Sequence, residues 1–144
     1  MTRILAVTVG AVVLSFVTGL YVGDVTTLKA QQGQIYELRT YTTAEGRLPA
    51  LLNRFSEMGE IELFHKHGMR SVGYWVPNEE SGLSENTMIY MLAHDGRETA
   101  RESWQGFGED PEWGPMREES QRDGPIVTNV ESVFLHPTDF SPAK

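Results

Sequence analysis

Hydrophobic and polar residues alternate along residues 35–41, the run Ile-Tyr-Glu-Leu-Arg-Thr-Tyr. A period of two predicts a β-strand, because successive side chains of a strand point to opposite faces of a sheet. One face would carry Tyr36, Leu38 and Thr40, and the other Glu37, Arg39 and Tyr41. The first strand is therefore expected to have one mainly apolar face and one face with a pair of opposite charges.

The patterns that follow predict the remaining elements. Apolar residues at helical spacing predict a helix from about residue 47 to residue 67, which Gly59 can interrupt. We then expect strands at 69–76 and 87–93 around a polar loop, a helix at 97–107, a short helical piece that begins at Asp110-Pro111, and a last strand at 126–136.

This order of strands and helices, βαββαβ, predicts an α+β fold: a ferredoxin-like antiparallel sheet with helices on one face. The other face of such a sheet would be uncovered and partly apolar. Large exposed apolar patches are rare on monomers, so we expect a homodimer that packs through this sheet face.

Ahead of this domain, residues 4–22 are uncharged and mostly apolar and follow a lone Arg3. As a helix they would span roughly 28 Å, close to the ~30 Å hydrocarbon core of a bilayer. The chain divides into a signal peptide or transmembrane anchor (1–23), a linker (24–33) and the domain (34–144). A cleavage site after Ala30 is a poor match, because Leu28 is not small.

Small residues recur every fourth position in this N-terminal hydrophobic helix, at Ala11, Ser15, Gly19 and Gly23. Such a stripe allows close helix packing in a membrane, although small residues are also common in leaders. We favour a single-pass anchor that holds the domain at the periplasmic side of the inner membrane. If the leader is cleaved, the domain is soluble in the periplasm.

Composition narrows the function classes. The 144 residues include no cysteine, which excludes disulfides, thiolate metal sites and cysteine nucleophiles. Twelve Lys and Arg stand against twenty Asp and Glu. Nucleic acid is therefore not an expected partner, because binding phosphates requires a basic face.

Four segments together resemble the NIPSNAP family, within the wider group of dimeric α/β-barrel proteins. They are residues 36–41, residues 67–75, residues 110–113 and residues 131–142, in this order. The resemblance implies a ferredoxin-like fold and a barrel formed by two chains. It implies no settled activity, and the catalytic residues of related barrel enzymes have no counterparts in this sequence.

The charged face of the first strand is the first candidate site. If Glu37, Arg39 and Tyr41 face the inside of a barrel, they could bind a polar ligand, with Arg39 as the anion anchor and Glu131 of the last strand as a fourth member. The alternative is that Glu37 and Arg39 pair with each other, or across a dimer, and only fix the register.

Two histidines and a set of aromatic residues are further candidates. His65 and His67 lie two apart on a predicted helix and would point away from each other, so no metal site is expected. Tyr74, Trp75, Trp104, Phe107 and Trp113 are expected to be core residues, with pocket lining as the alternative. Trp75 is the one of these counted as a candidate ligand-binding residue, because it alternates with Tyr74 and at least one of the two should face the barrel.

Two functions remain open. The favoured one is a membrane-anchored accessory or interaction subunit at the periplasmic face, in a larger membrane protein complex. The alternative is a small-molecule-binding barrel or a cofactor-independent oxygenase or isomerase. No cofactor is predicted.

Overall fold

The computed structural model describes residues 33–83 and 85–143. The strands are β1 (Ile35–Thr43), β2 (Arg70–Trp75), β3 (Thr87–His94) and β4 (Val127–Leu135). The helices are α1 (Leu48–Ser56), α2 (Glu60–Lys66), α3 (Arg97–Glu109) and α4 (Trp113–Ser120), and a short 3₁₀ turn, η1 (Glu79–Ser81), lies between β2 and β3.

The strands form one antiparallel sheet in the order β2-β3-β1-β4. β1 is central, so that Thr40 lies opposite Ile89 of β3 on one side and opposite Glu131 of β4 on the other. β2 and β4 are the edges. Together with the chain order of strands and helices, this topology is the ferredoxin-like α+β fold that the sequence predicts.

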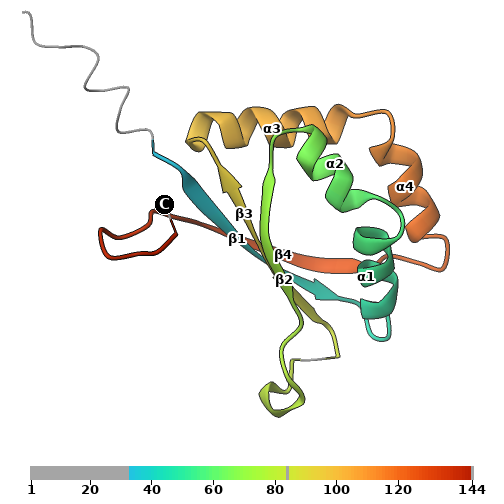
Figure 1. Ribbon diagram of the computed structural model, residues 1–144. Helices are drawn as coiled ribbons and strands as arrows, with labels where there is room; N and C mark the ends of the chain where they lie inside the picture. Colours follow the sequence, from blue (N-terminus) through green and yellow to red (C-terminus); the bar gives the residue numbers. More distant parts are fainter. Residues whose placement is uncertain (1–32, 84, 144) are drawn as a thin grey trace, which may run out of the picture.

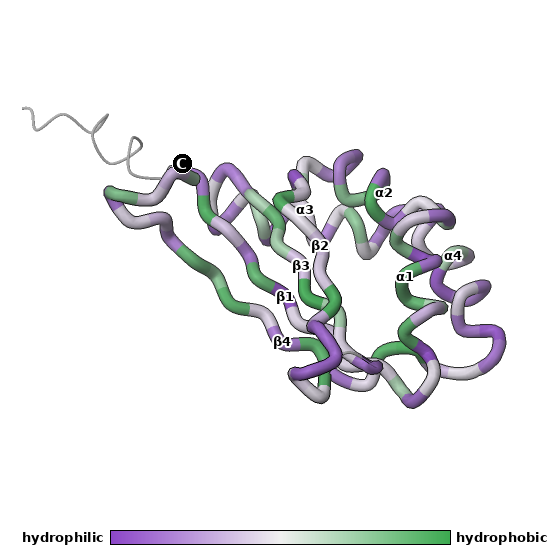
Figure 2. Tube along the Cα trace, turned by 60° about the horizontal axis from the view of Figure 1, so that its bottom comes forward, coloured by the Kyte–Doolittle hydropathy of each residue, from purple (hydrophilic) through white to green (hydrophobic). Residues whose placement is uncertain are grey.

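The helices α1 to α4 lie on one face of the sheet, where they bury the core (Figure 1). Three aromatic rings join the two layers. The ring of Phe55 from α1 lies 5.3 Å from that of Tyr90 in β3, and the ring of Phe64 from α2 stacks on Tyr90 at 5.9 Å. Along the Cα trace, apolar residues gather on the strands and polar ones on the outer turns of the helices (Figure 2).

The helix predicted over residues 47–67 is two helices. Gly59 has a φ of 97°, the left-handed region that residues with a Cβ rarely adopt, and this turn separates α1 from α2. The second predicted helical piece begins later than expected, at Trp113. Asp110 still acts at its start, because its Oδ1 accepts the backbone N–H of Glu112 at 2.9 Å.

The face of the sheet opposite the helices is uncovered within the described residues (Figure 1). Large apolar side chains lie there on both edge strands. Val72 and Trp75 of β2 are 48% and 49% exposed, and Val133 of β4 is 53% exposed. This face has the apolar character that the sequence predicts.

The predicted leader (1–23), its stripe of small residues and nearly all of the linker (24–33) lie outside the described residues. Among residues 33–83 and 85–143, no helix combines the length and the apolar character needed to cross a membrane.

Replacement of Gly59 by alanine should destabilise the domain. A Cβ there would be about 3.8 Å from its nearest neighbours, so the cost comes from the backbone conformation rather than from a clash. We expect Gly59→Ala to lower the free energy of unfolding by roughly 1–2 kcal/mol. The control is Gly108→Ala in α3, where nothing lies within 4 Å and φ is ordinary, and which should stabilise by up to ~1 kcal/mol. Urea denaturation of both variants checks this, and equal effects would contradict it.

Candidate functional site

Strand β1 directs Glu37, Arg39 and Tyr41 towards the helices. The ring of Tyr41 packs against Phe55 of α1 with centroids 6.2 Å apart, and the guanidinium of Arg39 lies 4.2 Å from the ring centre of Trp104 in α3. The predicted alternation is confirmed. The charged face, however, is the one under the helix layer and not the uncovered face through which a second copy would pack.

Glu37 is the centre of a hydrogen-bonded network. Its carboxylate is 1% exposed and accepts hydrogen bonds from Arg39 at 2.8 Å, from Ser132 of β4 at 2.6 Å and from the indole N–H of Trp104 at 2.7 Å. The ring of His94, at the end of β3, lies 3.0 Å from the same carboxylate.

These partners keep Glu37 ionised. Burial alone would raise its pKa, but the hydrogen bonds with His94, Ser132, Trp104 and Arg39 outweigh burial and lower the pKa to about 2. The expected pairing of Glu37 with Arg39 is present, and Glu37 is also bound by groups from three other elements, β3, β4 and α3.

The same chain of contacts continues to Tyr41. The hydroxyl of Tyr90 donates a hydrogen bond to the hydroxyl oxygen of Tyr41 at 2.9 Å, and the guanidinium of Arg39 donates to it over a longer 3.4 Å. Burial raises the pKa of Tyr90 well above its ordinary value, so that it remains a neutral donor. The Tyr41 oxygen thus accepts from two donors, and its own proton is available to a third group.

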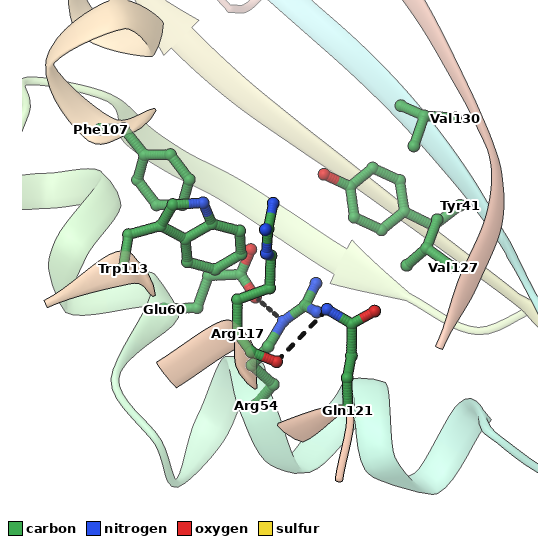
Figure 3. A pocket seen from close by; sticks show the side chains of 9 residues that line it. All are labelled: Tyr41, Arg54, Glu60, Phe107, Trp113, Arg117, Gln121, Val127 and Val130. Atoms are coloured by element: carbon green, nitrogen blue, oxygen red, sulfur yellow. Dashed lines mark hydrogen bonds and ion pairs between the residues drawn. The ribbon is translucent and has the colours of Figure 1, made fainter. Parts of the chain in front are cut away.

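That third group would lie in a cavity of about 320 Å³ between the sheet and the helices. Figure 3 shows the ring of Tyr41 on one wall and the aromatic rings of α3 and α4 on the other. The lining residues are Tyr41, Val127 and Val130 from the sheet, and Arg54, Glu60, Phe107, Trp113, Arg117 and Gln121 from the helices.

Arg54 and Glu60 form a buried ion pair beside this cavity. The Arg54 Nε lies 2.6 Å from Glu60 Oε2, and both side chains are at most 5% exposed. Burial raises the pKa of Glu60 even though Arg54 and Arg39 act in the opposite direction. The guanidinium of Arg54 also lies 5.2 Å from the ring centre of Trp113.

Arg117 enters the cavity from α4 without an acidic partner among the described residues. The side chain of Gln121 lines the same wall and donates to the Arg117 backbone carbonyl at 3.3 Å. With Arg54 balanced by Glu60, Arg117 leaves the lining with one net positive charge, in a chain whose net charge is −8. An arginine fork suits the planar oxygens of a carboxylate.

Glu131 and Trp75 lie apart from this site. Glu131 is opposite Thr40 on the uncovered face of the sheet, and its place near Glu37 is taken by the next residue, Ser132. Trp75 is on the uncovered face as well, folded over Gly73, while Tyr74 turns towards Phe55 in the core. Glu131 is therefore not a fourth member of the charged set.

The two helical histidines have separate partners. His65 Nε2 lies 2.8 Å from Ser71 Oγ, and His67 Nε2 lies 2.7 Å from Asp110 Oδ2. Within residues 33–83 and 85–143 no three His, Asp or Glu side chains are grouped as metal ligands.

Most of the cavity lining was missed by sequence reasoning. Arg54, Glu60 and Arg117 were not among the predicted site residues, because the packing of helices against the sheet is not visible in a local pattern. Ser132 could have been found, since period two in the last strand puts it on the face opposite to that of Glu131.

Comparison with known proteins places this geometry in a family. The family model described as NIPSNAP matches residues 36–142. A NIPSNAP family protein of unknown function from Agrobacterium tumefaciens strain C58 is 25% identical, with a TM-score of 0.66, and the match covers 79% of this chain and 96% of that one. A NIPSNAP-like domain protein from Burkholderia xenovorans is 19% identical, also with a TM-score of 0.66, over 77% and 90% of the two chains.

A more distant structure shares the fold alone. SnoaB, a cofactor-independent oxygenase from Streptomyces nogalater, is 12% identical with a TM-score of 0.50, over 76% of this chain and 98% of that one. No curated protein matches the chain.

The low pKa of Glu37 predicts acid sensitivity. The unfolded chain binds a proton at Glu37 near pH 4.5, whereas the folded protein resists protonation until about pH 2. The stability that this group contributes is complete above pH 4.5 and is lost as the pH falls towards 2, and it amounts to on the order of 3 kcal/mol. Urea denaturation between pH 6 and pH 2 should show this decline, and Glu37→Gln should flatten it. The other carboxyl groups, Glu60 included, are present in both proteins, so the difference between the two stability curves isolates Glu37. Parallel curves would contradict the assignment.

Proposed function

The chain belongs to the NIPSNAP family, which provides the ferredoxin-like frame but no reaction, and on that premise we propose that the domain binds a small organic anion in the cleft between sheet and helices. The observation that carries the proposal is Arg117, a cation with no acidic partner among the described residues, facing a cavity that also exposes the hydroxyl of Tyr41 (Figure 3).

The net charge of the cavity lining favours an anionic ligand over a cationic one. An anion would pair with Arg117 without displacing Glu60 from Arg54, whereas a cation would meet an excess positive charge. Arg39, held behind Tyr41, adds to the positive potential, although Glu37 compensates it. Charge-assisted hydrogen bonds to a guanidinium are about twice as strong as neutral ones.

The apolar walls of the cavity indicate what the uncharged part of the ligand is. Phe107, Trp113, Val127 and Val130 supply flat or branched apolar surface on both sides of the cavity. Its volume is near the lower end of the roughly 300–1,000 Å³ that is usual for ligand sites. The cavity therefore suits one aromatic ring that carries an acidic group.

This function retains part of the expected ligand site. Arg39 and Tyr41 contribute to it, and Glu37 holds Arg39 in position. Trp75 and Glu131 do not, because they lie on the other face of the sheet. The likeness to SnoaB indicates the frame only, so a cofactor-independent oxygenase reaction is not carried over.

Arg117→Gln should weaken the binding of phenylacetate, an aromatic carboxylate, by about 5- to 10-fold, because the exposed guanidinium supplies one charge-assisted contact. Isothermal titration calorimetry of the full-length chain measures this. Arg122→Gln is the matched control: Arg122 lies just beyond α4, pairs with Glu119 and does not line the cavity. Phenylacetamide, the neutral analogue, should bind more weakly than phenylacetate. Equal binding of the two compounds, or equal effects of the two variants, would refute an anion site.

A second role, as an exported and membrane-anchored accessory subunit at the periplasmic face, is favoured by the apolar run of residues 4–22. That run is long enough to span a bilayer, and the cleavage site behind it is a poor match. The domain would then lie outside the inner membrane and contribute to a larger membrane complex. Ligand binding and anchoring do not exclude each other.

A homodimer through the uncovered sheet face is part of the same proposal. Exposed Val72, Trp75 and Val133 give this face the apolar character of an interface. The cleft opens on the opposite side of the sheet, so that dimerisation would leave it accessible.

Native mass spectrometry of the full-length protein, extracted in mild detergent, tests both the membrane anchor and the homodimer. We expect a dimer whose subunits retain residues 1–30, with larger partners attached. Val133→Asp should shift the dimer to monomer, because it buries a charge in the interface. A monomer in the unmodified protein excludes the dimer, and loss of the leader excludes the anchor.

A further inference from the structure

Tyr41 and Glu60 face the same cavity from opposite layers of the fold (Figure 3). Tyr41 belongs to β1 and Glu60 to the first turn of α2. The charges in this region are close enough to act on one another, because Arg39, which contacts the Tyr41 hydroxyl, also affects the pKa of Glu60.

The hydroxyl of Tyr41 is arranged as a donor. Its oxygen accepts from Tyr90 and Arg39, so its proton is directed to whatever occupies the cavity. Hydrogen bonds in a chain polarise one another, so the two bonds that Tyr41 accepts strengthen the one that it donates.

The carboxylate of Glu60 is arranged as an acceptor. Arg54 Nε binds Oε2. Among the described residues no hydrogen bond to the other oxygen, Oε1, is found, and Glu60 lines the cavity although its side chain is almost fully buried. Oε1 is therefore the carboxylate oxygen left to accept from a ligand in the cavity. Burial raises the pKa of Glu60, which makes the ionised form a stronger base than an exposed glutamate.

We propose that the cleft catalyses proton transfer at a carbon atom next to a carbonyl group, with Glu60 as the base and Tyr41 as the donor to the carbonyl oxygen. This inference rests on the ligand-binding function proposed above and adds a reaction to it. An aromatic 2-oxo acid fits the site, with its carboxylate on Arg117 and its ring between Trp113 and the sheet.

The step is balanced within the cleft. The C–H bond breaks and its proton forms an O–H bond with Glu60 Oε1. The electron pair moves to the carbonyl oxygen, which becomes an enolate oxygen hydrogen-bonded by Tyr41. Return of the proton from Glu60 to carbon completes the cycle, and no oxidant, reductant or metal is consumed.

Phenylpyruvate in D₂O is the probe, since its methylene protons are lost from the ¹H NMR spectrum as they exchange for deuterium. The full-length chain should accelerate this exchange above the spontaneous rate. Glu60→Gln and Tyr41→Phe should each reduce the protein-dependent rate by about 100-fold or more. Glu62→Gln on α2 is the matched control, because Glu62 does not line the cavity, and it should leave the rate unchanged.

The exchange and binding measurements test the proton transfer and the ligand binding separately. Exchange that survives both Glu60→Gln and Tyr41→Phe overturns the inference, as does phenylpyruvate that binds without accelerated exchange, and in both cases the ligand-binding function stands. Failure of the unmodified protein to bind either phenylpyruvate or phenylacetate overturns both proposals. Should Glu60→Gln not fold, because it leaves Arg54 unpaired in the core, Tyr41→Phe decides alone, since it keeps the ring and its packing.

Discussion

The ionised carboxylate of Glu37, buried under the helix layer, is the constraint on which the surrounding structure depends. An unpaired charge there would cost several kcal/mol, so its oxygens must be satisfied by donors within the fold. Those donors come from β1, β3, β4 and α3, which makes the carboxylate a junction of four elements. The junction fixes Arg39, and Arg39 in turn contacts Tyr41. The orientation of the phenol in the cleft is thus a consequence of how a buried charge is accommodated.

The cleft is formed where the helix layer bends between α3 and α4, at a turn that we call the elbow. α3 ends at Glu109 and α4 starts at Trp113. Asp110, in the turn between them, contacts both His67 and Lys66 and so connects this turn to the end of α2. Backbone N–H, lysine and histidine donors lower the pKa of Asp110, so its carboxylate stays ionised and these contacts are kept. Because α4 is directed away at this elbow, the helix-side face of β4 is only partly covered, and Val130 is 44% exposed there.

Local patterns predicted the frame but little of the cleft. Strand patterns at the four strands and apolar helical spacing at the helices were enough for the βαββαβ order and for the shared face of Glu37, Arg39 and Tyr41. The break at Gly59 was visible as a glycine but not as a left-handed turn. Which face the helices cover depends on long-range packing, so the sequence left open whether the charged face lines a barrel, and in the structure it lies against α3. Arg54, Glu60 and Arg117 come together only through the helix–sheet contact, which no spacing in the sequence records.

The division between the two faces of the sheet bears on function. Polar groups that could act on a ligand point to the helix side, while the uncovered side carries the exposed apolar residues Val72, Trp75 and Val133. Successive residues of one strand supply both surfaces, because a strand directs neighbours to opposite faces. Changes that adapt the apolar face to a partner therefore need not disturb the cleft, and changes in the cleft need not disturb the partner. A single four-stranded sheet can in this way combine association on one side with chemistry on the other.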